Sequence, residues 1–170
     1  GHNRRVQQGS AIRHGETAWN LETRIQGQLD IALNDTGRWQ ARRLARAVAE
    51  AGLSALYASD LRRARDTAQA VAAQCGLSVV ADAGLRERGF GIFEGRTYAE
   101  IGQLWPALSL RWRQRDPDFG PEGGETLAAF HARCPSTRFA RPAGVASTNR
   151  LRASPPAPTV SHPCAAISCK

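Results

Sequence analysis

The chain alternates between helical and extended patterns from residue 36 to residue 82, and this alternation constrains the fold more than any other feature. Residues 36–52 and 60–76 carry apolar positions at helical spacing, with arginines on the opposite side. Each helical run is followed by a short apolar run, LSALYAS at 53–59 and LSVVAD at 77–82. Amphipathic helices that alternate with short strands are typical of parallel α/β sheets. We therefore predict a three-layer α/β/α sandwich with a mostly parallel sheet.

The same patterns predict where each helix ends and which residues face the sheet. Gly52 and Gly76 follow the two helical runs, so we expect both to act as C-caps. Thr97 and Glu100 have the spacing of a capping box, which predicts another helix that ends near Pro106. The residues predicted to face inward are Ala41, Leu44, Ala45 and Val48 in the first helix and Leu61, Ala64, Ala68, Val71 and Cys75 in the second.

Composition divides the chain into three regions, of which only residues 11–134 are patterned like a globular domain. Residues 1–10 are mostly polar, and only Ala11 and Ile12 lead directly into Arg13, too short an apolar run for a buried central strand. Residues 135–170 contain no acidic residue and six of the nine prolines, so we predict a tail without helix or strand that is disordered or translated from a shifted reading frame. The domain would then be truncated at both ends, and we expect it to fold poorly.

The net charge of +8 comes from the ends of the chain rather than from its patterned region. All 15 acidic residues lie between Glu16 and Glu125, and the segment from Arg13 to Arg115 contains 15 arginines. A nucleic-acid-binding face would place its basic residues within folded elements, with aromatic side chains among them. We therefore expect no nucleic-acid partner.

The sequence contains no pattern of a membrane span or a secretion signal. Its apolar runs are far shorter than the ~18 to 20 residues that a spanning helix needs. The four cysteines form no CxxC pair, and three of them lie at or beyond Cys134, so neither a disulfide framework nor a metal site is indicated. We expect a cytoplasmic protein without a membrane partner that uses no metal ion or other cofactor.

The stretch IRHGETAWN at 12–20 places an arginine and a histidine at the end of the first candidate strand. Taken alone, such a pair is typical of a solvated loop. Ligands of parallel sheets, however, bind at the carboxyl ends of the strands, and these residue types suit phosphoryl transfer. His14 can supply an imidazole nucleophile, Arg13 a planar cation for phosphate oxygens, and Gly15 a close approach of the backbone.

Four further motifs follow this stretch, and the set of five carries a family resemblance. They are RIQGQLDIALNDTGRWQA at 24–41, SDLRRARDT at 59–67, LRERGFGIFEGRT at 85–97 and PEGGET at 121–126. In this order and with these gaps, the motifs closely resemble the histidine phosphatase superfamily, in particular its phosphoglycerate-mutase-like branch. The resemblance covers residues 11–134. It implies a phosphoglycerate-mutase-like fold and phosphoryl transfer from a small phosphorylated metabolite through a phosphohistidine.

The resemblance also implies roles for individual residues. His14 would be the phosphorylated nucleophile, and Glu87 would donate the proton to the leaving group. The residues that would hold the phosphate are Arg13, Asn20, Gln26, Gly27 and Arg63.

Three of these positions have plain structural alternatives. Glu87 could be a surface carboxylate paired with Arg86 or Arg88. Arg63 could lie on a solvated helix face, as its arginine neighbours are expected to do. Asn20 could cap a helix or a turn.

The chain departs from the family where a second histidine should complete the phosphate pocket. The family carries this histidine late in the chain, in an H-G-G-like stretch after an apolar strand. His131 lies in a helical pattern and His162 precedes a proline, so neither matches. The sequence therefore leaves two functions open, an enzyme that is impaired in this chain and a catalytically inactive pseudoenzyme that binds phosphate.

Phosphatase and mutase activity differ in whether water or a second hydroxyl receives the phosphoryl group. The segment between Glu87 and the PEGGET motif is short and leaves little room for a lid, which favours a phosphatase. We expect the substrate's organic group to be read by residues 104–120, which contain three arginines and two tryptophans. Neither the individual substrate nor the oligomeric state follows from the sequence.

Overall fold

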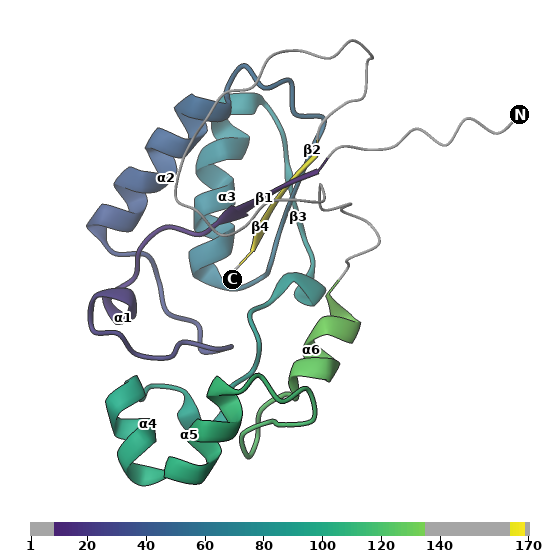
Figure 1. Ribbon diagram of the computed structural model, residues 1–170. Helices are drawn as coiled ribbons and strands as arrows, with labels where there is room; N and C mark the ends of the chain where they lie inside the picture. Colours follow the sequence, from purple (N-terminus) through teal and green to yellow (C-terminus); the bar gives the residue numbers. More distant parts are fainter. Residues whose placement is uncertain (1–8, 135–163, 169–170) are drawn as a thin grey trace, which may run out of the picture.

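The computed structural model describes residues 9–134 and 164–168, and its centre is a parallel sheet in the order β1-β4-β2-β3 (Figure 1). All three strand pairings are parallel, and the predicted α/β class is confirmed. The strands are β1 (Gly9–Arg13), β2 (Ala55–Ala58), β3 (Val79–Ala81) and β4 (Cys164–Ser168). The α-helices are α1 (Ala18–Leu21), α2 (Asp35–Val48), α3 (Arg62–Cys75), α4 (Tyr98–Leu104), α5 (Pro106–Arg113) and α6 (Leu127–Arg133), and two 3₁₀ turns span Ala83–Leu85 and Gly91–Phe93.

Helices α2 and α3 lie side by side and pack against the sheet through small and branched apolar side chains (Figure 1). Alanines dominate both inner faces, and the absence of longer side chains lets the two helices approach each other closely. The inward positions predicted from the sequence are buried or half-buried, as expected. The fully buried members of this core are Leu56, Ala58, Ala64, Ala68 and Val71.

The ends of the helices agree with the sequence at two places and differ at one. Gly76 caps α3 in the left-handed conformation with φ +66°, and the predicted capping box opens α4, which ends before Pro106. Gly52, however, is not a C-cap. Helix α2 already ends at Val48, and Gly52, with φ +65°, lies in the turn that follows. The glycine therefore marks the turn into β2 rather than the end of the hydrogen-bonded helix.

The two ends of the chain contribute more to the sheet than the sequence predicted. Strand β1 begins at Gly9, inside the segment predicted not to match, and is an edge of the described sheet. Strand β4 lies between β1 and β2, with Ala166 opposite both Ala11 and Tyr57.

The prediction that the tail forms no strand is therefore wrong for residues 164–168, and the described sheet does not lack its centre. The prolines upstream dominate the composition of the tail and obscure a short apolar run that pairs once β1 and β2 flank it. The remaining predictions for residues 1–8, 135–163 and 169–170 lie outside the described residues.

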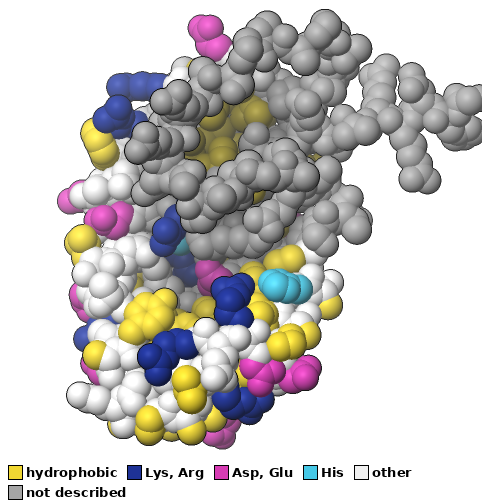
Figure 2. Space-filling view, viewed as in Figure 1, with side chains coloured by type: hydrophobic (Ala, Val, Ile, Leu, Met, Phe, Trp, Pro, Cys, Tyr) yellow, Lys and Arg dark blue, Asp and Glu magenta, His cyan; other side chains and the backbone are white. Residues whose placement is uncertain are grey.

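Helices α4 and α5 pack against each other and form a lobe beyond the carboxyl ends of the strands (Figure 1). Its core contains Ile25, Phe93, Ile101 and Phe119. These side chains pack against Trp105, at the junction of α4 and α5, and Trp112 on α5. Figure 2 shows hydrophobic and basic side chains next to one another on this lobe. None of the described helices is long and apolar enough to cross a membrane.

Two glycines let the loop after β1 pack tightly against the start of α2. A Cβ at Gly15 would lie 2.5 Å from the carbonyl oxygen of Gly37, and a Cβ at Gly37 would lie 2.0 Å from that of Glu16. The loop is also tied to α3, because the Gly15 N–H donates a hydrogen bond to Thr67 Oγ1 at 3.0 Å. This packing fixes the position of the residue between β1 and Gly15, which is His14.

We predict that Gly37→Ala destabilises the protein, although alanine is the better helix former. The clash with Glu16 is with backbone, and overpacking of this kind lowers the free energy of unfolding by about 1–3 kcal/mol. Gly102→Ala in α4 is the matched control, because nothing lies within 4 Å of its Cβ and helix propensity favours alanine by ~1 kcal/mol. Chemical denaturation measures both variants, and equal stabilities would contradict the proposed packing.

Candidate active site

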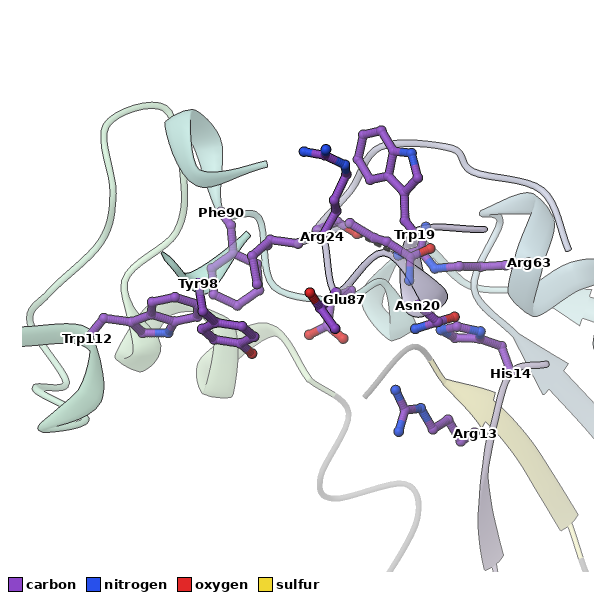
Figure 3. A pocket seen from close by; sticks show the side chains of 14 residues that line it. Arg13, His14, Trp19, Asn20, Arg24, Arg63, Glu87, Phe90, Tyr98 and Trp112 are labelled. Atoms are coloured by element: carbon purple, nitrogen blue, oxygen red, sulfur yellow. Dashed lines mark hydrogen bonds between the residues drawn. The ribbon is translucent and has the colours of Figure 1, made fainter. Parts of the chain in front are cut away.

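A cavity of about 390 Å³ opens between the carboxyl ends of the strands and the α4–α5 lobe (Figure 3). The structure brings all seven residues singled out from the sequence to its wall, from four separate segments of the chain. They are Arg13, His14, Asn20, Gln26, Gly27, Arg63 and Glu87.

His14 is buried at the base of the cavity, with only 9% of its surface exposed. Its Nδ1 lies 2.5 Å from the carbonyl oxygen of Gly15, which can only accept, so Nδ1 carries the proton and Nε2 keeps its lone pair. Burial, followed by the positive charges of Arg63 and Arg13, lowers the pKa of His14 to about 4 and outweighs the opposing hydrogen bond to Gly15. The imidazole is therefore neutral and nucleophilic near neutral pH.

Arg63 is almost fully buried, at 1% exposure, and lies on the first turn of α3. Its Nη1 donates to the carbonyl of Leu29 at 2.7 Å and its Nη2 to that of Gly27 at 2.6 Å. Within the described part of the chain, its Nε is the buried side-chain polar atom without a hydrogen-bond partner. The solvated alternative for Arg63 is wrong, whereas its neighbours Arg62 and Arg65 are exposed. A buried cation that lines the cavity suits an anionic ligand.

Asn20 and Gln26 are held in place by the buried Thr17. The Thr17 N–H donates to Asn20 Oδ1 at 2.9 Å, and the Thr17 hydroxyl donates to Gln26 Oε1 at 2.8 Å. Asn20 thus takes part in the capping box of α1, as its structural alternative predicted, and lines the cavity as well. Because both amide oxygens are engaged, both NH₂ groups are left to donate into the cavity.

Glu87 lies across the cavity from His14 and Asn20 (Figure 3). Burial raises the pKa of its carboxyl above the ordinary value, although the nearby Arg63, Arg13 and Arg133 charges act in the opposite direction. A carboxyl with a raised pKa retains a proton that it can donate.

Glu87 is not a surface carboxylate paired with the side chain of Arg86 or Arg88, the structural alternative that the sequence left open. Arg86 pairs instead with Asp60, with 2.6 Å between Nε and Oδ1. The Arg88 side chain donates to the carbonyls of Glu125 and Phe119, and only its backbone N–H reaches the Glu87 carboxylate.

The sequence predicted the far wall of the cavity only in part. Of residues 104–120, only Trp112 lines it, and the three arginines of that segment do not. Trp112 stacks on Tyr98 at 5.2 Å with an interplanar angle of 8°, and lies 5.4 Å from Phe90. The lining residues that sequence reasoning missed are Trp19, Thr23, Arg24, Ile25, Phe90 and Tyr98. Several belong to the same motifs as the predicted residues, which is the signal that could have found them.

His131 is exposed on α6, as its helical pattern predicted, and does not line the cavity. The second candidate histidine, His162, lies outside the described residues. Over the ranges 9–134 and 164–168, no three His, Cys, Asp or Glu side chains are grouped to hold a metal ion.

Comparison with known proteins identifies the family. The family model of the histidine phosphatase superfamily (branch 1) matches residues 11–139 of the chain. The chain belongs to this family. As a histidine phosphatase it is 45% identical over 126 residues to phosphoglycerate mutase-like protein 4 of Arabidopsis thaliana, covering 72% of this chain and 55% of that protein. It is 41% identical over 122 residues to glucosyl-3-phosphoglycerate phosphatase of Mycolicibacterium vanbaalenii, covering 72% and 54%.

A solved relative shares the fold of this histidine phosphatase. The structure of a mycobacterial glucosyl-3-phosphoglycerate phosphatase with VO3 superposes with a TM-score of 0.76 at 30% identity, covering 96% of this chain and 75% of the other. The chain spans about half the length of these two curated relatives.

The opposite pKa shifts of His14 and Glu87 predict a pH profile with two limbs. For hydrolysis of glycerol 2-phosphate, kcat/KM should fall below about pH 4 as the nucleophile takes up a proton. It should also fall at higher pH, as the carboxyl of Glu87 loses its proton. Glu87→Gln should remove the upper limb and lower kcat/KM by about 10²–10⁴-fold. The substrate ionises in the same way with the wild-type protein and with Glu87→Gln. If kcat/KM fell at high pH equally in both, Glu87 would be excluded as the cause of that fall.

Proposed function

We propose that this histidine phosphatase hydrolyses phosphomonoesters through a phosphohistidine at His14. The observation that carries the proposal is the buried guanidinium of Arg63, which lines the same cavity as the neutral imidazole and has no ion-pair partner among the described residues. A phosphate bound there gives the buried cation its counter-ion and presents its phosphorus to Nε2 of His14.

In the first step, the Nε2 lone pair attacks the phosphorus and the bond to the ester oxygen breaks. Glu87 donates its proton to the departing oxygen, so an alcohol leaves instead of an alkoxide. Arg13, Arg63 and the amides of Asn20 and Gln26 stabilise the negative charge on the three remaining phosphoryl oxygens.

In the second step, water attacks the phosphorus of the phosphohistidine and the P–N bond breaks. Glu87, now a carboxylate, takes a proton from that water, and inorganic phosphate leaves with the neutral imidazole restored. Both carboxyl proton states are therefore used in each turnover, which suits a group whose pKa burial has raised.

Water is the acceptor that we propose, which makes the chain a phosphatase rather than a mutase. One relative is named a phosphatase, and another is named a phosphoglycerate mutase-like protein. The segment from residue 98 to residue 113 forms only the two short helices α4 and α5, which supports an acceptor site open to water. Equal amounts of alcohol and inorganic phosphate would be released by hydrolysis, whereas a mutase would transfer the phosphoryl group to a second hydroxyl.

A catalytically inactive pseudoenzyme is the second candidate, favoured by one observation. Among the described residues, no second histidine lines the cavity beside His14. We propose that this absence slows turnover relative to the longer relatives without removing the nucleophile. Turnover of p-nitrophenyl phosphate at the rate of the mycobacterial phosphatase would contradict the proposed impairment.

The decisive variant is His14→Ala, with His131→Ala as the matched control because His131 is exposed outside the cavity. We predict that His14→Ala lowers hydrolysis of p-nitrophenyl phosphate by ~10³-fold or more, the scale of losing a nucleophile, and that His131→Ala leaves it unchanged. The wild-type chain should acquire acid-labile, base-stable phosphate at His14. Undiminished hydrolysis by His14→Ala would refute the mechanism, whereas binding of inorganic phosphate without labelling would support the pseudoenzyme.

We also propose that the organic group of the substrate packs against the aromatic wall formed by Phe90, Tyr98 and Trp112. These rings lie across the cavity from the phosphate-binding end, and Tyr98 is 62% exposed although its ring stacks on Trp112. A flat apolar face beside a charged site favours a ring-containing ester over a small polar one.

Trp112→Ala tests this wall. For 1-naphthyl phosphate, KM should rise about three- to tenfold through loss of ring contact, whereas KM for glycerol 2-phosphate should change little. Trp39→Ala is the control, because Trp39 is half exposed on α2 and does not line the cavity. Equal effects of Trp112→Ala on both substrates would contradict the proposed role.

A further inference from the structure

The PEGGET motif supplies no residue to the cavity, yet it packs directly against the loop that carries Glu87. Gly124 allows this contact, because a Cβ there would lie 2.7 Å from the carbonyl oxygen of Gly89. Phe90 and Gly124 also form an antiparallel bridge, and the Glu125 N–H donates to the Gly89 carbonyl at 2.8 Å. The motif thus forms a backbone platform beneath the Glu87 loop.

Arg133, at the end of α6, holds the other side of this loop through three N–H groups of its guanidinium, and the remaining two bind Glu125. Nη1 donates to the carbonyls of Gly84 and Arg86, each at 3.0 Å. Nη2 donates to the carbonyl of Glu87 at 2.7 Å and to Glu125 Oε2 at 2.9 Å. Nε donates to Glu125 Oε1 at 2.5 Å. All five donors are therefore used.

Glu125 completes the clamp from the opposite direction. Its Oε2 accepts the N–H of Gly89 at 2.7 Å, so one ion pair holds the backbone both before and after the Glu87 side chain. The hydrogen bonds from Arg133, followed by that from the Gly89 N–H and the Arg133 charge, hold the pKa of Glu125 below its usual range, which keeps the pair ionised. Glu125 directly precedes Thr126, the N-cap of α6, and Arg133 is the last residue of that helix.

We propose that Arg133 and Glu125 are positioning residues that hold the Glu87 loop so that its carboxyl reaches the oxygen of the leaving group. The inference rests on the proposed role of Glu87 as proton donor. A small displacement of such a donor can cost up to about a hundredfold in rate, although neither Arg133 nor Glu125 lines the cavity.

The ratio of kcat/KM on two substrates with different leaving groups distinguishes a positioning role from a merely structural one. Release of p-nitrophenolate needs little help from an acid, whereas release of an alkoxide from glycerol 2-phosphate requires a proton. Loss of positioning should therefore lower kcat/KM for the alkyl ester selectively, while general damage to the fold lowers both rates together.

The experiment compares Glu87→Gln, Arg133→Gln and the double variant with Arg111→Gln on both substrates, using the 170-residue chain. Arg111 is the matched control, because it forms an Arg–carboxylate pair with Asp116 at 2.8 Å outside the cavity. We expect Arg133→Gln to lower kcat/KM for glycerol 2-phosphate about ten- to a hundredfold and that for p-nitrophenyl phosphate less than about threefold. The double variant should be no worse than Glu87→Gln, and Arg111→Gln should leave the ratio of the two rates unchanged.

Arg133→Lys and Glu125→Gln extend the test where Arg133→Gln does not fold. A lysine keeps the charge but has only three donors on one nitrogen, so Arg133→Lys should show the same selective loss. Equal losses on both substrates in the folded variants, or no loss, would overturn the positioning role while a selective Glu87→Gln defect leaves the proposed function intact. A Glu87→Gln variant without selectivity would refute Glu87 as the proton donor, and the inference with it.

Discussion

The burial of the Arg63 guanidinium is the constraint on which the rest of the site depends. A cation removed from water costs several kcal/mol unless other groups compensate, and no salt bridge in the described part of the chain neutralises Arg63. The carbonyls of Gly27 and Leu29 satisfy one N–H on each of its two terminal nitrogens. The loop at 26–29 must therefore fold over the start of α3, which brings Gln26 to the cavity beside Arg63.

The same low-polarity surroundings set the two proton states of the proposed chemistry. Burial disfavours a positive imidazole and a negative carboxylate alike, so it lowers the pKa of His14 and raises that of Glu87. One physical cause thus prepares a nucleophile and an acid at opposite walls of one cavity. The arginine charges reinforce the shift of His14 but oppose that of Glu87, and burial outweighs them there.

Local sequence patterns predicted those parts of the fold that depend on neighbours along the chain. The inward faces of α2 and α3, the Gly76 cap and the capping box of Thr97 follow from helical spacing and from side chains three or four residues apart. Strand β4 could not be predicted in this way, because its apolar run is short and lies in a proline-rich tail. It becomes a strand only by pairing with β1 and β2, which are far away in the sequence.

By itself the sequence determined the residue types of the site, since four of the five motifs supplied the histidine, the arginines, the amides and the acid. Only the tertiary structure decided which arginine is buried with a free donor, that Asn20 both caps α1 and lines the cavity, and that Trp112 rather than a nearby arginine forms the far wall. The tertiary structure also brought the PEGGET motif and Arg133 into hydrogen-bond contact with the loop that carries Glu87. The reason is physical: residue identity fixes which chemistry is available, but burial, pKa and orientation arise from contacts between segments that meet only in the folded chain.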